Sequence, residues 1–131
     1  MLKNKTIIIT GGTGTFGTNF IEYILKKKIK VKKVIIFSRD EFKQTEMQNR
    51  FANNKFLNLR YFIGDIRDKD RLRMALEDVD IILHAAAIKH VPIAEYNPFE
   101  AIKTNVLGVQ NLIEVALEKN IEKFISLSTD K

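Results

Sequence analysis

Cysteine is absent from this chain of 131 residues. The absence excludes a disulfide framework and a thiolate metal site. No apolar run is long enough to cross a bilayer. The apolar stretch at residues 6–10, which follows Lys3 and Lys5, is too short for the hydrophobic region of a secretory signal. We therefore expect a cytoplasmic protein without a membrane span.

Long linkers, internal repeats and low-complexity tracts are also absent. Hydrophobic residues make up 45% of the chain and charged residues 29%, which is typical of a globular protein. The length predicts one domain over residues 1–131, with a core of its own.

The net charge of +6 raises the question of a nucleic-acid partner. Lysines gather at residues 26–33, where a helix is expected to end and where cations suit the helix dipole. No basic run is interleaved with aromatic residues, as nucleic-acid binding would favour. We expect no nucleic-acid partner, and a small phosphate-bearing ligand needs only a few of these charges.

Apolar runs typical of buried strands alternate with helical patterns along the whole chain. The predicted strands are 5–10, 32–37, 58–63, 80–84 and 123–128, and the predicted helices are about 15–28, 40–53, 68–78 and 98–119. This alternation predicts a doubly wound parallel α/β sheet, Rossmann-like, with strand order 3-2-1-4-5. Ligands of such sheets bind beyond the carboxyl ends of the strands.

A glycine-rich turn joins the first strand to the first helix. Gly12, Gly14 and Gly17 match G-x-G-x-x-G, and Gly11, Gly14 and Gly17 match G-x-x-G-x-x-G. Such glycines serve a tight turn, close approach of a phosphate, and close packing of helix on strand. The pattern favours a dinucleotide site over a plain strand–turn–helix. Its candidate residues are Gly11, Thr13, Gly14, Thr15, Phe16 and Gly17.

The residues after the second strand bear on the choice of cofactor. Arg39 can accommodate a 2′-phosphate, which favours NADP, and Lys43, one helical turn further on, can add a second cation. Asp40 keeps NAD open. The same residues also suit a helix start, with Ser38 as the cap and Asp40 and Glu41 in the first turn. Both readings can hold together. The candidate cofactor residues here are therefore Ser38, Arg39, Asp40, Glu41 and Lys43.

Asp65 and Ile66 follow the third strand and are also candidates for the cofactor site. An aspartate here can accept a hydrogen bond from an adenine amino group. It can equally cap the turn, and the residues alone leave the two roles open.

After the fourth strand, the small residues Ala85 and Ala86 let a cofactor lie against the backbone. Lys89 is a cation that can meet cofactor phosphate or substrate. His84 and His90 are the only histidines, and without cysteine they make a poor metal site, so we expect no metal.

Two further polar sites complete the set. Asn105, on the long last helix, is expected to hydrogen-bond the backbone near the fourth strand, beside the cofactor. Asp130 and Lys131, after Thr129, place a carboxylate and an amine at the ligand edge. They can act as acid and base, or form a frayed, charged C-terminus.

Together these residues resemble the extended short-chain dehydrogenases/reductases over essentially the whole chain. Within that superfamily the sequence is most similar to the inverting UDP-N-acetylglucosamine 4,6-dehydratases of bacterial surface-polysaccharide and flagellin-sugar biosynthesis. Retaining dehydratases carry Thr-Asp-Glu where this chain has Thr-Asp-Lys, and 4-epimerases usually carry Ser-Ser. The signatures are Ser38-Arg39-Asp40-Glu41, the run from His84 to Pro92, Glu95-Tyr96-Asn97-Pro98 and Ser128-Thr129-Asp130-Lys131.

The resemblance implies a chemistry as well as a fold. A hydride leaves C4 of the sugar for NADP⁺, which makes a 4-keto group and acidifies the C5 proton. Lys131 then acts at C5 as the base, with Asp130 protonating the departing C6 hydroxyl and Thr129 beside them. Hydride returns to C6, and reprotonation of C5 from the opposite face inverts that centre.

The resemblance also implies parts that lie beyond Lys131: a Tyr-x-x-x-Lys pair and a substrate region. Tyr23 and Lys27 match that spacing only by accident, on the helix after the glycine turn. We therefore expect the 131-residue chain alone to be inactive, and we expect a homo-oligomer because the fifth strand is an open edge. The alternatives are a non-catalytic NADP-binding module and another sugar-nucleotide epimerase or dehydratase.

Overall fold

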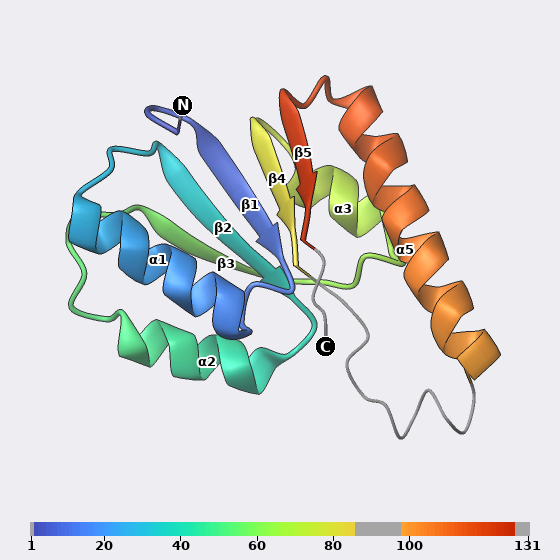
Figure 1. The fold of residues 1–131 in the computed structure, drawn as a ribbon, viewed down its shortest axis with the longest axis horizontal. Helices are drawn as coiled ribbons and strands as arrows, with labels where there is room; N and C mark the ends of the chain where they lie inside the picture. Colours follow the sequence, from blue (N-terminus) through green and yellow to red (C-terminus); the bar gives the residue numbers. More distant parts are fainter. Residues whose placement is uncertain (1, 86–97, 128–131) are drawn as a thin grey trace.

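The computed structural model describes residues 2–85 and 98–127, with the backbone alone at 98–106. Strands and helices alternate throughout (Figure 1). The elements are β1 (Thr6–Thr10), α1 (Thr15–Lys27), β2 (Lys33–Ser38), α2 (Glu41–Arg50), β3 (Leu59–Ile63), α3 (Lys69–Ala75), β4 (Ile81–His84), α5 (Pro98–Glu118) and β5 (Lys123–Ser126).

The strands form a five-stranded parallel sheet in the order β3-β2-β1-β4-β5, which confirms the predicted fold class and strand order. Every residue of β1 and β4 is buried, as continuous apolar runs predict for central strands. The edge strands β3 and β5 are partly exposed. All strand arrows point the same way, so their carboxyl ends share one edge of the sheet (Figure 1).

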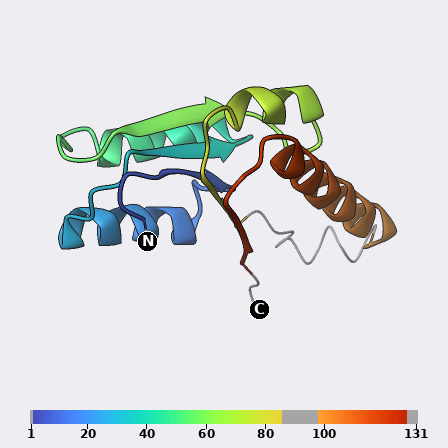
Figure 2. The same ribbon diagram turned by 90° about the horizontal axis from the view of Figure 1, so that it is seen from above.

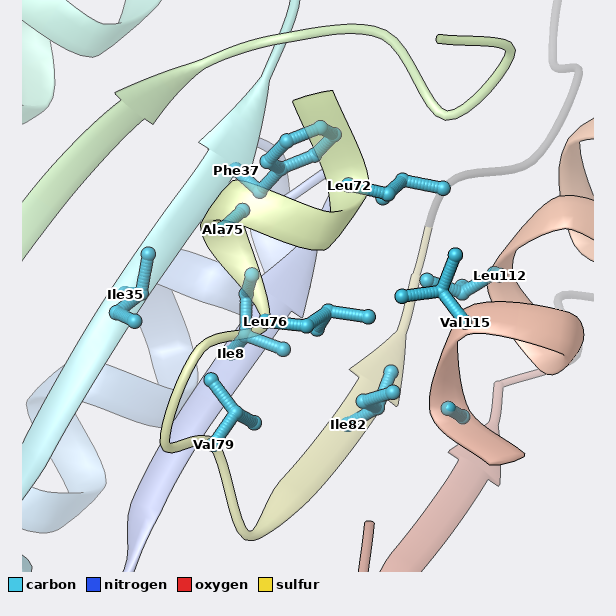
Figure 3. Close-up of a cluster of buried hydrophobic side chains, with 11 residues drawn as sticks. Ile8, Ile35, Phe37, Leu72, Ala75, Leu76, Val79, Ile82, Leu112 and Val115 are labelled. Carbon is cyan, nitrogen blue, oxygen red and sulfur yellow. The ribbon is translucent and has the colours of Figure 1, made fainter. Parts of the chain in front are cut away.

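Helices cover both faces of the sheet (Figure 2). Strand side chains alternate between the faces, so Ile7 and Ile9 pack against α1 and α2 while Ile8 packs against α3 and α5. The buried side chains form one cluster on each face of the sheet. Figure 3 shows the cluster on the face covered by α3 and α5, in which Leu72 and Leu112 pack these two helices onto β2, β1 and β4. Each cluster therefore holds a pair of helices, and the loops that precede α1, α2 and α3 start from the carboxyl ends of β1, β2 and β3.

Two aspartates set where α2 and α3 begin. The Asp40 carboxylate accepts from the backbone N–H of Lys43 at 3.0 Å, and the Asp68 carboxylate accepts from that of Arg71 at 3.1 Å. Asp40 is therefore the N-cap of α2. The prediction of Ser38 as that cap is wrong, because Ser38 is the last, buried residue of β2.

Two helices end earlier than predicted, at Arg50 and Ala75. Beyond α2, the Asn54 side-chain oxygen accepts from the backbone N–H groups of Phe56 and Leu57, both at 2.9 Å, and this turn competes with further helix. Beyond α3, Asp78 has a φ of 62°, which a right-handed helix does not allow. Within the described residues, no helix combines the length and apolar character that a membrane span requires.

Candidate functional site

Backbone hydrogen bonds bring the loops of the carboxyl edge together. The N–H of Gly11 donates to the Phe37 carbonyl at the end of β2, at 2.8 Å. The N–H of Ala85, just after β4, donates to the Thr10 carbonyl at the end of β1, at 2.9 Å. Gly11 and Ala85, which follow β1 and β4, therefore lie at the same carboxyl edge of the sheet.

The glycine turn has the three properties that its spacing predicts, distributed over different glycines. Gly11 has a φ of 68°, a backbone conformation that residues with a side chain rarely adopt. A Cβ on Gly17 would lie 1.7 Å from the Gly12 carbonyl oxygen, so α1 packs directly on the turn. A Cβ on Gly14 would meet only the Gly11 oxygen within 4 Å, at an ordinary van der Waals distance of 3.7 Å, so the turn is not crowded there.

The N-terminus of α1 is suited to an anion. Gly14 is its N-cap and supplies no side-chain hydrogen bond, and no acidic residue lies in the first turn. The first N–H groups and the positive end of the helix dipole are therefore not neutralised by side chains of the turn. Thr15 is exposed here, Thr13 is half-buried, and Phe16 stacks on Phe20 with ring centroids 5.8 Å apart.

Ser38 is buried at the end of β2, where it contacts Gln44, a residue that the sequence did not point to. The amide of Gln44 donates to the Ser38 hydroxyl at 3.0 Å and to the Phe62 carbonyl at 3.1 Å. Gln44 and Met47 are the buried residues of α2, at a spacing of one helical turn. This spacing marks the buried face, but a glutamine on a polar helix gives no sign that its amide will join two strands.

Arg39 is exposed beyond the end of β2, ahead of the helix that Asp40 caps. Its guanidinium Nη1 lies 3.6 Å from Oδ2 of Asp65, which follows β3. Glu41 and Lys43 lie in the first turn of α2 and are exposed. The structure thus brings Arg39 and Asp65, which come from adjacent loops, to one place.

Asp65 has the turn-capping role that the sequence left open. Its Oδ1 accepts from the backbone N–H of Arg67 at 2.9 Å, and Oδ2 accepts from Arg67 Nη2 at 2.7 Å. The hydrogen bonds from the Arg67 side chain hold the pKa of the Asp65 carboxyl below its ordinary value, against the opposing effect of burial. The carboxylate is therefore charged at neutral pH.

The loop that carries Asp65 and Ile66 is held by α5. The Asn111 amide donates to the Ile66 carbonyl at 3.2 Å and to the Arg67 carbonyl at 3.1 Å. A Cβ on Gly108 would lie 2.4 Å from the Ile66 side chain, so Ile66 would have to shift if Gly108 carried a side chain. Asn111 could not be identified as a site residue from the sequence, where its polar position beside buried Leu112 is the only local signal.

His84 is the last residue of β4, and its ring is buried. Its Nδ1 lies 2.6 Å from the Thr10 hydroxyl, with which it shares a hydrogen bond. Burial lowers the pKa of this histidine, which favours the neutral ring. Across residues 2–85 and the described side chains after them, no three potential ligands group as a metal site.

Several predicted site residues lie outside the described residues: Ala86, Lys89, Thr129, Asp130 and Lys131. The backbone of Asn105 lies in α5, but its side chain is also outside the described part. What is described is therefore the edge formed by the loops after β1, β2 and β3, together with Ala85.

Comparison with known proteins places the chain in a family. The polysaccharide biosynthesis protein family matches residues 7–131, which is nearly the whole chain. The chain belongs to this family. It is 54% identical over 131 residues to a UDP-N-acetylglucosamine 4,6-dehydratase (inverting) of Campylobacter jejuni, covering 100% of the chain and 38% of that enzyme.

Two further similarities bear on the family's range. A UDP-glucose 4-epimerase of Rickettsia prowazekii is 45% identical over 133 residues, again covering 100% of the chain and 38% of the relative. The crystal structure of DesIV, a dTDP-glucose 4,6-dehydratase from Streptomyces venezuelae with NAD bound, is similar with a TM-score of 0.73 and 26% identity. That match covers 91% of this chain and 38% of DesIV, so the chain spans well under half the length of these relatives.

Proposed function

We propose that the protein is an NADP-dependent, C5-inverting UDP-N-acetylglucosamine 4,6-dehydratase of surface-polysaccharide or flagellin-sugar biosynthesis. The observation that carries this proposal is the 54% identity, over the whole chain, to the C. jejuni inverting dehydratase. The sequence Thr129-Asp130-Lys131, in the form of the inverting enzymes, supports it. We further propose a cytoplasmic location and a homo-oligomer.

The carboxyl edge fits a dinucleotide. The uncrowded backbone at Gly14 and the uncapped start of α1 would hold the pyrophosphate against backbone N–H groups. Arg39 would hold a 2′-phosphate beyond β2, and Ala85 and Ala86 would leave room beside the backbone after β4. The loop at Asp65 and Ile66 would flank the adenine.

The chemistry falls to the residues after β5. NADP, when bound, supplies the hydride acceptor and donor for the reaction. Lys131 would take the proton from C5 of the sugar, which a ketone at C4 makes acidic. Asp130 would give its proton to the C6 hydroxyl as that group departs, and Thr129 and Lys89 would orient the sugar nucleotide. Water is lost across C5 and C6, so the proton taken and the proton given balance.

Incubation of a full-length protein that contains these 131 residues with UDP-N-acetylglucosamine and NADP is expected to give a 4-keto-6-deoxy sugar nucleotide inverted at C5. NMR of the product made in D₂O should show deuterium at C5, because Lys131 exchanges that proton before it returns. The variant Lys131→Met should lose this exchange while NADP binding stays at the parent level. NADP binding with no product at all would support a non-catalytic module instead.

A second candidate is a sugar-nucleotide 4-epimerase, which the 45% identity to the R. prowazekii UDP-glucose 4-epimerase favours. The same product analysis separates the two functions. An epimerase inverts C4 and keeps the C6 hydroxyl, so UDP-glucose would give UDP-galactose with no loss of water. Epimer without a 4-keto-6-deoxy product would overturn the dehydratase proposal.

Arg39→Ala is expected to weaken NADP binding by about 10- to 100-fold, which is the effect of losing one hydrogen-bonded charge pair. NAD lacks the 2′-phosphate, so its affinity should change little and the preference for NADP should disappear. The matched control is Arg50→Ala, an exposed arginine at the far end of α2 that pairs with Glu22. Equal loss of NADP and NAD affinity in Arg39→Ala would contradict the assignment.

A further inference from the structure

Two arginines from different loops meet at one carboxylate on the carboxyl edge. Arg67 binds Asp65 through Nε, at 3.1 Å from Oδ2, and through Nη2, at 2.7 Å from the same oxygen. Arg39, from the loop after β2, brings Nη1 to 3.6 Å from that oxygen. Both guanidinium groups therefore lie within a few ångströms of Oδ2, and the three groups together carry a net charge of +1.

The two arginines differ in how firmly they are held. Arg39 is 68% exposed, and its contact with Asp65 is longer than a hydrogen bond. Arg67 forms several hydrogen bonds with Asp65, and the backbone carbonyl of Arg67 accepts from the Asn111 amide. Arg67 is thus a hydrogen-bonded cation on a loop that α5 anchors, and Arg39 is a more exposed and more loosely paired cation beside it.

We propose that Arg67 is a second determinant of cofactor specificity, which binds the 2′-phosphate of NADP together with Arg39. Asp65 is then a positioning residue that holds the two guanidinium groups side by side. This inference rests on the proposed use of NADP. It assigns the second cation to the loop after β3, where the sequence alone pointed to Lys43 on α2.

The charge of the ligand supports a pair of arginines. A phosphate monoester carries about −1.5 to −2 near neutral pH, more than one cation balances. Guanidinium groups match the planar pairs of oxygens on a phosphate, and a carboxylate between two of them offsets their mutual repulsion until the ligand arrives. The firmly bound Arg67 needs little reordering on binding, which reduces the entropic cost.

The position of the Asp65 oxygens favours this role over adenine recognition. Oδ1 already accepts from the backbone N–H and from Nε of Arg67, at 2.9 and 3.2 Å. Oδ2 accepts from Nε and Nη2 and faces Arg39. A carboxylate has about four acceptor sites, so Arg67 occupies most of them.

The test is titration of the chain and its Arg67→Gln variant with NADP and with NAD. We expect NADP affinity to fall by about tenfold, the effect of one charge-assisted contact, with NAD affinity within about twofold of the parent. The affinity for adenosine 2′,5′-bisphosphate should fall as the affinity for NADP does, and the affinity for 5′-AMP should not. Arg67→Lys, which keeps the charge without the forked geometry, should recover part of the loss.

Arg60→Gln, on exposed β3, is the matched control and should keep the parent affinities. Thermal unfolding checks that Arg67→Gln folds, since its backbone N–H still reaches Asp65. If Arg39→Ala removes the NADP preference and Arg67→Gln leaves it intact, the role of Arg67 is wrong and the proposed cofactor stands. Equal losses of affinity for NADP and NAD in Arg67→Gln would also overturn the proposed role of Arg67. A parent chain without NADP preference would overturn the cofactor proposal itself.

Discussion

Gly17→Ala is expected to destabilise the fold by about 3 kcal/mol and to abolish dinucleotide binding. The added Cβ would lie 1.7 Å from the Gly12 carbonyl oxygen and 2.6 Å from its carbon. These are backbone atoms of the turn, with no flexible end to move aside, so α1 must shift away from β1. Chemical denaturation and an NADP titration of the same sample measure the two effects.

Gly14→Ala is the matched control within the same turn. Its Cβ would have 3.7 Å of clearance, and the φ of −80° suits alanine, so the free energy of unfolding should stay close to the parent's. NADP binding should still weaken, because the methyl group would occupy the space proposed for the pyrophosphate. Parent-like stability in Gly17→Ala would show that α1 does not depend on this close approach.

Phe37→Ala is expected to lower the free energy of unfolding by about 3–5 kcal/mol. Phe37 is 1% exposed at the carboxyl end of β2 and stacks on Phe62, with ring centroids 5.8 Å apart. Its ring also fills the space beside Gly64, where a Cβ would lie 2.6 Å away. The cavity would therefore loosen the two loops that carry Arg39 and Asp65.

Phe42→Ala is the control for this prediction, because Phe42 is 71% exposed on α2, a few residues further on. Its removal should change the free energy of unfolding by no more than about 0.5 kcal/mol. Urea denaturation of both variants measures the difference. A loss of less than 1 kcal/mol in Phe37→Ala would mean that the core closes around the missing ring.

The sequence was sufficient to predict the sheet and the position of the glycine turn. Continuous apolar runs such as residues 34–37 mark buried parallel strands, and their alternation with helical patterns limits the topology to a few choices. The glycine spacing located the start of α1 because each glycine meets a local backbone demand. Local patterns also placed Asp68 at the start of α3.

Side-chain contacts between distant segments were not predictable in this way. Asn111 reaches the backbone of Arg67, 44 residues earlier, and Gln44 joins β2 to β3 across 18 residues. Neither contact has a periodic signal, because each depends on where the sheet places the partner. Ser38 was misassigned as a cap for the same reason: the strand buries it, and Asp40 then caps the helix.

The cofactor choice can be tested most directly by calorimetric titration of the chain with NADP and NAD under identical conditions. Because Asp65 holds Arg67 beside Arg39, we expect NADP to bind at least about tenfold more tightly than NAD. The difference should shrink as salt screens the exposed guanidinium groups. Equal affinities, or tighter binding of NAD, would contradict the proposed 2′-phosphate site.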